Sequence, residues 1–280
     1  MKRLISFLLL IFAVQTAAAW GPKGHDVVAY IAECNVNNRV KAKVMQALGG
    51  HTFTYYSSWA DNIRNFPEFR HTSTWHYANV DEGYTYATMP KNPKGDVLTA
   101  VTLIVEQLKS GKITPEEENI YLRMLIHFVG DMHCPMHAGR LSDLGGNLVT
   151  VKWFGREVKL HAVWDDLIVE SVRKWSYSEW QREIDNVSRK EREALSAGTP
   201  LDWMNETVAI CQQVYKDAPA GSELSWDYQN ENFPLLEMQL RKAGYRLARL
   251  SIHKMIRTVK QNRFYCRLYP IRFRLLLYLL

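Results

Sequence analysis

The sequence predicts an all-α protein, a single mainly helical domain with one short β-hairpin. Apolar residues recur at helical spacing in six segments, and glycine or proline residues separate those segments. One further stretch alternates apolar and polar residues around a turn signal. Because no internal repeat and no Ser- or Pro-rich linker divides the chain, one domain over residues 20–250 is the simplest organisation.

The predicted helices share one pattern, in which apolar residues lie three and four positions apart and so fall on one helix face. Breakers lie between them, such as Gly49-Gly50 and the stretch from Pro219 to Gly221. The helices are expected over residues 26–35, 97–108, 117–130, 163–172, 201–215 and 234–250.

The β-hairpin is expected between the third and fourth of these helices. Leu148 to Trp153 and Glu157 to Leu160 alternate on either side of Phe154-Gly155. Two alternating runs around such a short turn are typical of paired antiparallel strands.

The first 19 residues predict a signal peptide. Two basic residues precede an apolar run, and Ala17-Ala18-Ala19 supplies a small-residue cleavage site. Cleavage there would make Trp20 the first residue of a secreted or periplasmic protein. One interpretation is an ordinary leader whose mature end happens to be tryptophan. In the other, the free α-amine and the carbonyl oxygen of Trp20 chelate a metal ion together with His25.

Residues 251–280 form a basic and apolar C-terminal tail. They hold seven Lys or Arg residues and no acid, and they end in a leucine-rich run. No segment after the leader reaches the ~20 apolar residues that a membrane span needs, so we expect no stable span. We expect the tail to be a disordered extension or a sequence artefact; binding to an anionic surface is the alternative.

The charge of the chain belongs to its two ends. Nine of the 35 basic residues lie in residues 1–19 and 251–280, so residues 20–250 carry 26 basic and 29 acidic residues, a formal net charge of −3. A body of this charge does not attract phosphate through Lys and Arg. If a polyanion binds here, bound cations must supply most of the positive charge.

The cysteines number four, Cys34, Cys134, Cys211 and Cys266. In an oxidising compartment disulfide bonds are plausible, but four cysteines allow three pairings and the sequence does not choose among them. None has the Cys-x-x-Cys spacing of a structural zinc site.

Two histidine–aspartate pairs lie four residues apart, His127 with Asp131 and His161 with Asp165. At this spacing both side chains lie on one helix face and can bind the same ion. Each pair alone is weak evidence, because this spacing also arises by chance. His137 adds to it, since a proline two residues earlier ends the first helix and can turn His137 back toward the site.

Asp61, Arg64 and His76 lie further upstream in aromatic surroundings. Each also has an ordinary explanation: a carboxylate at a helix start, its ion-pair partner three residues on, and a satisfied core or surface histidine. Those explanations do not account for five histidines and three aspartates in apolar helical sequence, which are costly to bury without cations. Imidazole and carboxylate ligands without thiolate favour zinc.

With these residues in this spacing, the chain from Trp20 to about Leu250 resembles the zinc-dependent single-strand nucleases of fungi and plants, the family of nuclease S-one and nuclease P-one. The motifs Trp-Ala-Asp61-x-x-Arg64, His127-Phe-x-Gly-Asp131, Pro135-x-His137 and Asp143-x-Gly-Gly146-Asn147 carry the likeness. The ligands it implies are Trp20, His25, Asp61, His76, His127, Asp131, His137, His161 and Asp165.

The resemblance implies a mainly α-helical fold of the phospholipase C/P-one nuclease type with three Zn²⁺ ions. By that likeness, Asp61, His76, His127 and Asp131 would hold one ion. The amine and carbonyl of Trp20, His25 and the other oxygen of Asp131 would hold the second. His137, His161 and Asp165 would hold the third.

The resemblance also implies substrate contacts. Arg64 and Asn147 would contact the scissile phosphate and, with the shared ligand Asp131, would form the catalytic group. Tyr77 would stack on a base. Asn79 would touch the substrate where several family members have an acid, so base preference and part of the rate remain open.

The function expected is a secreted phosphodiesterase that hydrolyses single-stranded RNA and DNA to 5′-phosphorylated products, with 3′-nucleotidase activity, acting as a monomer. A zinc-dependent phospholipase C is the nearest alternative, since such enzymes share this fold and ligand set. A non-catalytic zinc-binding protein is the alternative from another class. The Gly146-Asn147 motif and Arg64 favour the nuclease.

Overall fold

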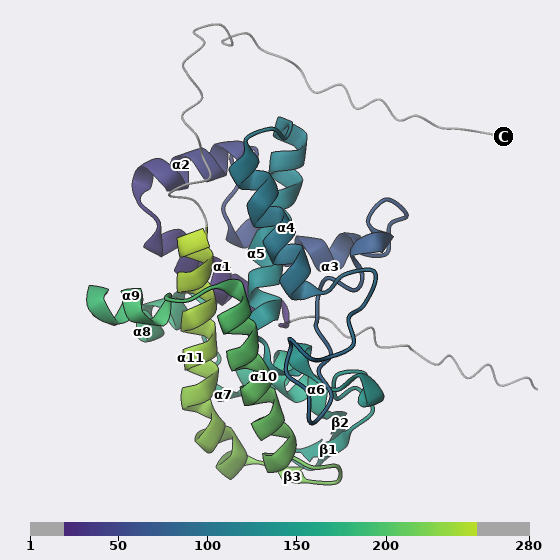
Figure 1. Ribbon diagram of the computed structural model, residues 1–280. Helices are drawn as coiled ribbons and strands as arrows, with labels where there is room; N and C mark the ends of the chain where they lie inside the picture. The colour runs from purple at the N-terminus through teal and green to yellow at the C-terminus, as the bar shows by residue number, and fades with distance from the viewer. Residues whose placement is uncertain (1–19, 251–280) are drawn as a thin grey trace, which may run out of the picture.

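The computed structural model describes residues 20–250, which form a mainly helical body (Figure 1). The predicted signal peptide, the predicted tail and Cys266 lie outside the described residues. All six predicted helical segments are helical. They correspond to α1 (Pro22–Asn35), α4 (Val97–Ser110), α5 (Pro115–His133), the stretch 163–172, α10 (Pro200–Asp217) and α11 (Trp226–Leu250). In 163–172 the helix begins as a π-helix, η5 (Val163–Leu167), and continues as α7 (Ile168–Val172).

Further short helices connect these elements. They are α2 (Asn38–Ala47), η1 (Thr54–Tyr56), α3 (Trp59–Ile63), η2 (Arg70–Thr72), η3 (Pro135–Ala138), η4 (Leu141–Asp143), α6 (Leu160–Ala162), α8 (Tyr177–Ile184) and α9 (Arg189–Leu195). The periodicity of the sequence does not predict α2, α8 or α9. These helices bury too few side chains to leave a periodic apolar pattern, because α2 and α8 each bury two side chains and α9 buries none. Their starts are fixed instead by side-chain caps from Asn37, Ser176 and Ser188.

The predicted hairpin is present as β1 (Thr150–Trp153) and β2 (Arg156–Lys159), paired antiparallel. Phe154 and Gly155 both have positive φ, 49° and 77°, as a tight two-residue hairpin turn requires. A third strand, β3 (Glu223–Leu224), pairs parallel to β1 and gives the order β2-β1-β3. A strand of two residues is too short for an alternating pattern, so the sequence analysis does not include it.

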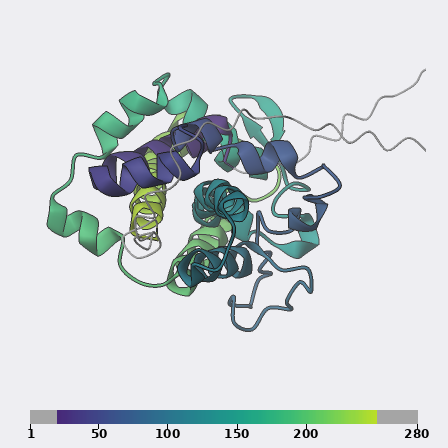
Figure 2. The ribbon, with the colours of Figure 1, turned by 90° about the horizontal axis from the view of Figure 1, so that it is seen from above.

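Helix α5 forms the centre of the fold. Viewed from above, it runs through the middle of the body, and it packs against α1, α4, α10 and α11 (Figure 2). Thr114 and Glu117 form a capping box at its start, with Pro115 in the first turn. The helix ends at His133, and Pro135 begins η3, so the predicted turn before His137 is confirmed.

Close packing of α1 on α11 fixes the position of the N-terminal helix beside α5. A Cβ atom at Gly244 of α11 would lie 2.4 Å from Cγ2 of Ile31 in α1. The two helices therefore approach closely at a residue without a side chain, and α1 carries His25 into the interior.

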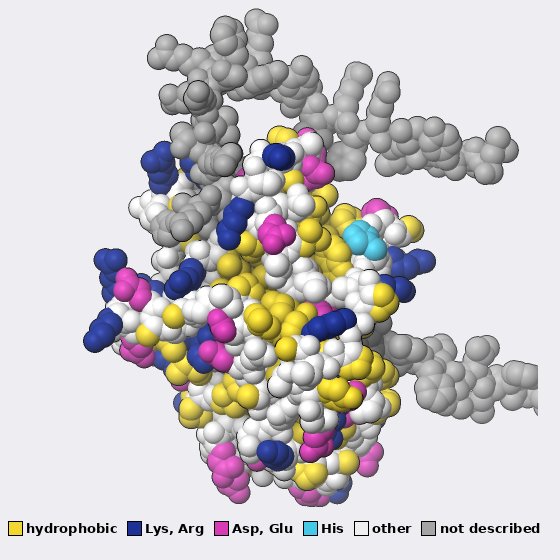
Figure 3. All heavy atoms as spheres, viewed as in Figure 1, with side chains coloured by type: hydrophobic (Ala, Val, Ile, Leu, Met, Phe, Trp, Pro, Cys, Tyr) yellow, Lys and Arg dark blue, Asp and Glu magenta, His cyan; other side chains and the backbone are white. Residues whose placement is uncertain are grey.

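The surface carries mixed charge. On the face in Figure 3, Lys and Arg side chains are interspersed with Asp and Glu, and no continuous basic field covers it. Within residues 20–250, no helix is long and apolar enough to cross a membrane. Cys34, Cys134 and Cys211 are free thiols, so the structure contains no disulfide between described cysteines.

A buried polar network joins α5 to α10 and α11. Arg246 donates from Nη1 to Nε2 of His133, at 3.0 Å, and from Nη2 to Glu206 Oε2, at 2.6 Å. His133 Nδ1 lies 2.7 Å from the carbonyl oxygen of Val129, to which it donates. Burial, and then the charge of Arg246, lower the pKa of His133 to about 3, so its ring is neutral in the folded protein.

We expect the His133→Gln variant to lose less stability than the wild type as the pH falls. The folded pKa of about 3 lies below the value of 6.5 for an unfolded histidine, so the unfolded chain binds the proton first. This contribution to stability is present above about pH 6.5 and is lost as pH falls toward the folded pKa, at up to ~1.4 kcal/mol per pH unit. Between about pH 7 and about pH 5, the free energy of unfolding in urea should fall by about 2 kcal/mol more for the wild type. Equal slopes, measured with chelator present throughout, would contradict this assignment.

Candidate metal centre

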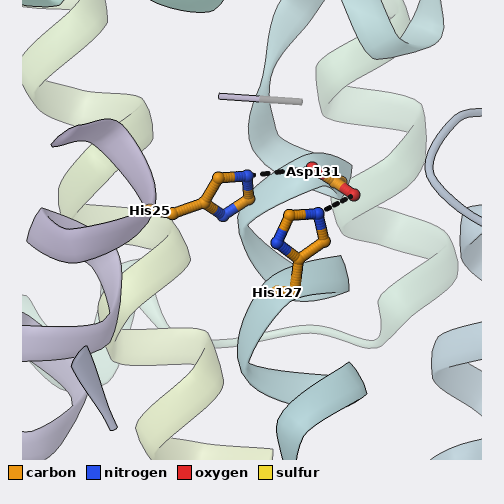
Figure 4. Close-up of side chains that lie close together, drawn as sticks. All are labelled: His25, His127 and Asp131. Carbon is orange, nitrogen blue, oxygen red and sulfur yellow. Dashed lines mark ion pairs between the residues drawn. The ribbon is translucent and has the colours of Figure 1, made fainter. Parts of the chain in front are cut away.

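The carboxylate of Asp131 lies at the centre of a buried cluster of imidazoles (Figure 4). Its Oδ1 is 3.3 Å from His25 Nε2 and 3.7 Å from His137 Nδ1. Its Oδ2 is 3.0 Å from His76 Nδ1 and 3.2 Å from His127 Nε2. Helix α5 supplies Asp131 and His127 one turn apart, as their spacing predicts, and α1 brings His25 to the same point.

Asp61 completes this side of the cluster from α3. Its Oδ1 lies 3.5 Å from His76 Nδ1 and 3.7 Å from His127 Nε2. The expected ion pair with Arg64 is also present, with Nη1 3.4 Å from Asp61 Oδ1. Asp61 is thus both a carboxylate in the first turn of a helix and a member of the cluster, so the two explanations offered by the sequence are compatible.

The second histidine–aspartate pair forms an adjoining group. Asp165 Oδ1 lies 3.5 Å from His137 Nε2, and Asp165 Oδ2 lies 3.8 Å from His161 Nε2. The π-helix η5 carries Asp165, and η3 carries His137. The buried thiol of Cys134 lies 3.9 Å from Asp165 Oδ1, a contact that the sequence analysis did not include. Its only signal is its place three residues after Asp131 in the motif.

Backbone carbonyl groups orient three of the imidazoles. The Nδ1 atoms of His127, His137 and His161 lie 2.6–2.7 Å from the carbonyl oxygens of Ser57, His76 and Gly145. In the neutral ring each Nδ1 therefore carries the proton and donates, which leaves Nε2 with its lone pair. This Nε2 faces Asp61 and Asp131 in His127, and Asp165 in His137. This is the arrangement by which proteins prepare histidines for a metal ion.

Glycine residues allow the cluster to close. A Cβ atom at Gly130 would lie 2.8 Å from His25 Nδ1, so the glycine in the motif clears the space for that ring. At the other side, Asp143 Oδ1 accepts hydrogen bonds from the Gly146 amide, at 2.6 Å, and from the Tyr215 hydroxyl, at 2.8 Å. The Asp143-x-Gly-Gly146 motif thus fixes the loop whose carbonyl holds His161.

The electrostatics of the cluster are dominated by burial. Burial, and then the charge of His127, lower the pKa of His25 to about 4. Burial also lowers the pKa of His127, but the carboxylates of Asp131 and Asp61 outweigh it and raise the pKa to about 9. Burial raises the pKa of Asp165 well above its usual range. Two buried carboxylates, the partly buried Asp61 and five imidazoles cannot all be compensated by one another.

The donor atoms fit metal ions. Both ring nitrogens of His25, Nε2 of His76, Nε2 of His137, and Oδ1 of Asp61 and Asp131 are buried without a hydrogen-bond partner. Three groups of donors, each with atoms within 4.8 Å of one another, can hold an ion: His25, His127 and Asp131; Asp61, His76 and His127; and Cys134, His137 and Asp165. The first two groups share His127. Unpartnered buried donors are costly, and cations would satisfy them.

The remaining predicted residues are Trp20, Tyr77, Asn79 and Asn147. Trp20 is fully buried, and the amide of Gly21 donates to the carbonyl oxygen of Asp165 at 2.5 Å, which holds the Trp20 backbone beside the ligands. Tyr77, Asn79 and Asn147 are partly buried. Asn147 Nδ2 donates to the Leu144 carbonyl, at 2.8 Å. Tyr77 follows His76 in the chain, and Asn147 follows Gly146 of the loop that holds His161. The roles of these residues toward a substrate stay predictions.

Known proteins are similar in sequence to this chain over most of its length. The family model described as S1/P1 Nuclease matches residues 20–255. Endonuclease 3 of Arabidopsis thaliana is 31% identical over 272 residues, which cover 88% of this chain and 92% of that protein. Endonuclease 4 of the same plant is 30% identical, with 86% and 91% covered. Nuclease S1 of Aspergillus oryzae is 25% identical, with 84% and 91% covered.

We expect Gly130→Ala to release metal while leaving helix α5 intact. The added methyl group would lie 2.8 Å from His25 Nδ1 and displace that ring. In an ordinary helix interior the same change stabilises by about 1 kcal/mol, so it does not break the helix. Zinc content after desalting should fall by about one equivalent. Glu106→Ala, at an exposed position of helix α4, is the control; full zinc in both variants would contradict the steric argument.

Proposed function

Because this chain belongs to the S1/P1 nuclease family, we propose that it is a zinc-dependent hydrolase that cleaves single-stranded RNA and DNA. The observation that carries the proposal is the buried cluster around Asp131, whose unpartnered nitrogen and oxygen atoms fit metal ions. The names of the relatives, Endonuclease 3 and Nuclease S1, support nucleic acid as the substrate.

Three zinc ions account for the donors. The first would be held by Asp61, His76, His127 and Asp131. The second would be held by His25, the other oxygen of Asp131 and the amine and carbonyl of Trp20. The third would be held by His137, His161 and Asp165, with the Cys134 thiol beside Asp165. The group of Asp61, His76 and His127 supports the first set, the nearness of His25 to Asp131 supports the second, and that of His137 to Asp165 supports the third. The burial of Trp20 against Gly24 is compatible with the second.

Zinc supplies ionised water at neutral pH and positive charge for the phosphate. The residues of this chain hold the substrate around it. Arg64 can donate two parallel hydrogen bonds to phosphate oxygens once it leaves Asp61. Asn147 can donate from its amide, and Tyr77 offers a ring on which an unpaired base stacks. A base must leave its duplex to stack there, so a preference for single strands follows.

We further propose a secreted or periplasmic protein that begins at Trp20, releases 5′-phosphorylated products and also removes 3′-phosphates from nucleotides. The proposal of an N-terminal ligand depends on this processing. A chain that continues before Trp20 has an amide nitrogen there, and an amide lacks the lone pair that an amine offers to zinc.

We expect His127→Ala to remove metal and abolish cleavage. His127 contacts both Asp61 and Asp131, so its loss opens two ligand groups at once. Release of 5′-mononucleotides from single-stranded RNA should fall on the order of a thousandfold, and zinc content should fall by at least one ion. His71→Ala serves as the matched control, because its side chain is exposed. Normal rates with three zinc ions in H127A would refute the assignment.

We expect residues retained before Trp20 to lower both zinc content and activity. A protein that starts at Trp20 and one that starts at Ala17 differ by three alanines, and only the first has a free amine at residue 20. The longer form should bind about one zinc fewer and cleave single-stranded RNA more slowly. Equal zinc content and equal rates would show that the amine is not a ligand.

A further inference from the structure

A strip of aromatic and cationic side chains lies beside the metal centre and has no part in it. We define the aromatic strip as His51, Tyr55, Tyr56, Trp59 and Arg123. Its outer end is open to solvent, since Tyr55 is 64% exposed and His51 is exposed. Large exposed aromatic side chains need an explanation when they are ordered into a stack.

The outer part of the strip is a preformed stack of rings. His51 and Tyr55 lie parallel, with centroids 3.9 Å apart and planes 11° apart. Tyr56 meets both edge-on, with its centroid 4.9 Å from Tyr55 and 5.7 Å from His51. The Tyr55 ring is therefore held in one orientation by its neighbours although most of it faces solvent, so little conformational entropy is lost when a planar group stacks on it.

The inner part of the strip carries a positive charge. The Arg123 guanidinium lies 4.0 Å from the Tyr56 ring centroid and 5.0 Å from that of Trp59, and Nη2 donates to the Tyr56 hydroxyl at 3.0 Å. Among residues 20–250, no carboxylate lies within ion-pair distance of Arg123, and its Nε is buried without an acceptor. A guanidinium without an acidic partner is suited to a phosphate.

The strip is continuous with the metal centre. Arg123 lies four residues before His127 on α5, which is one helical turn of about 5.4 Å on the same face. Ser57, between Tyr56 and Trp59, supplies the carbonyl oxygen that holds His127 Nδ1 at 2.7 Å. Helix α3 begins at Trp59 and carries Asp61 two residues later. The same short segment therefore forms both the strip and one wall of the cluster.

We propose that the aromatic strip binds nucleotides of a single strand that extends beyond the scissile phosphate. This inference rests on the proposed function. Tyr55 stacks on an unpaired base, and Arg123 lies where it can neutralise a phosphate between that base and the metal centre. Stacking is the main attraction, because residues 20–250 carry a formal net charge of −3 and mixed surface charge. In a duplex the faces of the bases are covered, so the strip adds to the preference for single strands.

The experiment compares a dinucleotide with an eight-nucleotide single strand in steady-state cleavage by wild type and Tyr55→Ala. Tyr55 is exposed, so the variant keeps its fold. Loss of one stacking contact should raise the KM of the eight-nucleotide strand about tenfold, within the range for one base. The KM and kcat of the dinucleotide, which has no nucleotide beyond the two that the scissile phosphate joins, should not change. Anisotropy of a labelled phosphorothioate strand of the same length should show the same loss of affinity.

Two matched variants complete the design. Tyr55→Phe keeps the ring and should retain wild-type binding of the longer strand. Trp226→Ala removes a ring that is 63% exposed at the start of α11. This end of α11 lies beside β3 and away from α2, the helix that precedes the strip (Figure 1), so the KM of neither substrate should change. Equal KM values for wild type and Y55A on the long strand, or an equal rise on both substrates, would overturn the inference and leave the strip as surface packing. Failure of the wild type to cleave either substrate would refute the proposed function instead, while anisotropy still tests the strip.

Discussion

The buried carboxylate of Asp131 is the constraint on which the rest of the structure depends. Its side chain has no exposure and meets four imidazoles, from α1, from the segment after η2, from α5 itself and from η3. A charge in such a place is expensive unless it is compensated from every side. Burial raises its pKa, but the charge of His127 and the surrounding imidazoles outweigh burial and hold the pKa well below its usual range.

This constraint explains why α5 occupies the centre of the fold. One face of the helix supplies His127, Gly130 and Asp131 to the cluster, and its last residue, His133, anchors α11 through Arg246. The donors all come from residues 25–165, whereas α8 to α11 supply none among the described residues. Helices α8, α10 and α11 instead pack against α1 or α5.

Much of the fold and of the candidate site can be predicted from the sequence, because both depend on the spacing of residues along one helix or strand. Long helices leave a periodic pattern, and a pair such as His127 and Asp131 needs only one helical turn to converge. Features that depend on tertiary contacts leave no such spacing in the sequence and cannot be predicted from it. The carbonyl oxygens of Ser57 and Gly145 that orient the imidazoles have no side-chain signal, and neither does the approach of Cys134 to Asp165. The short strand β3 exists only because β1 is beside it.

The cluster also joins parts of the chain that are far apart in sequence. His25 and Asp165 lie 140 positions apart, and both contribute to one continuous set of donors. Any ion that bridges such groups acts as a cross-link, because closing a long loop in the unfolded chain is entropically unfavourable. Ligands of this kind bind the folded state alone and shift the folding equilibrium toward it. Occupancy of such a site would thus govern the stability of the fold as well as its chemistry, so loss of the ions would also expose the chain to proteolysis.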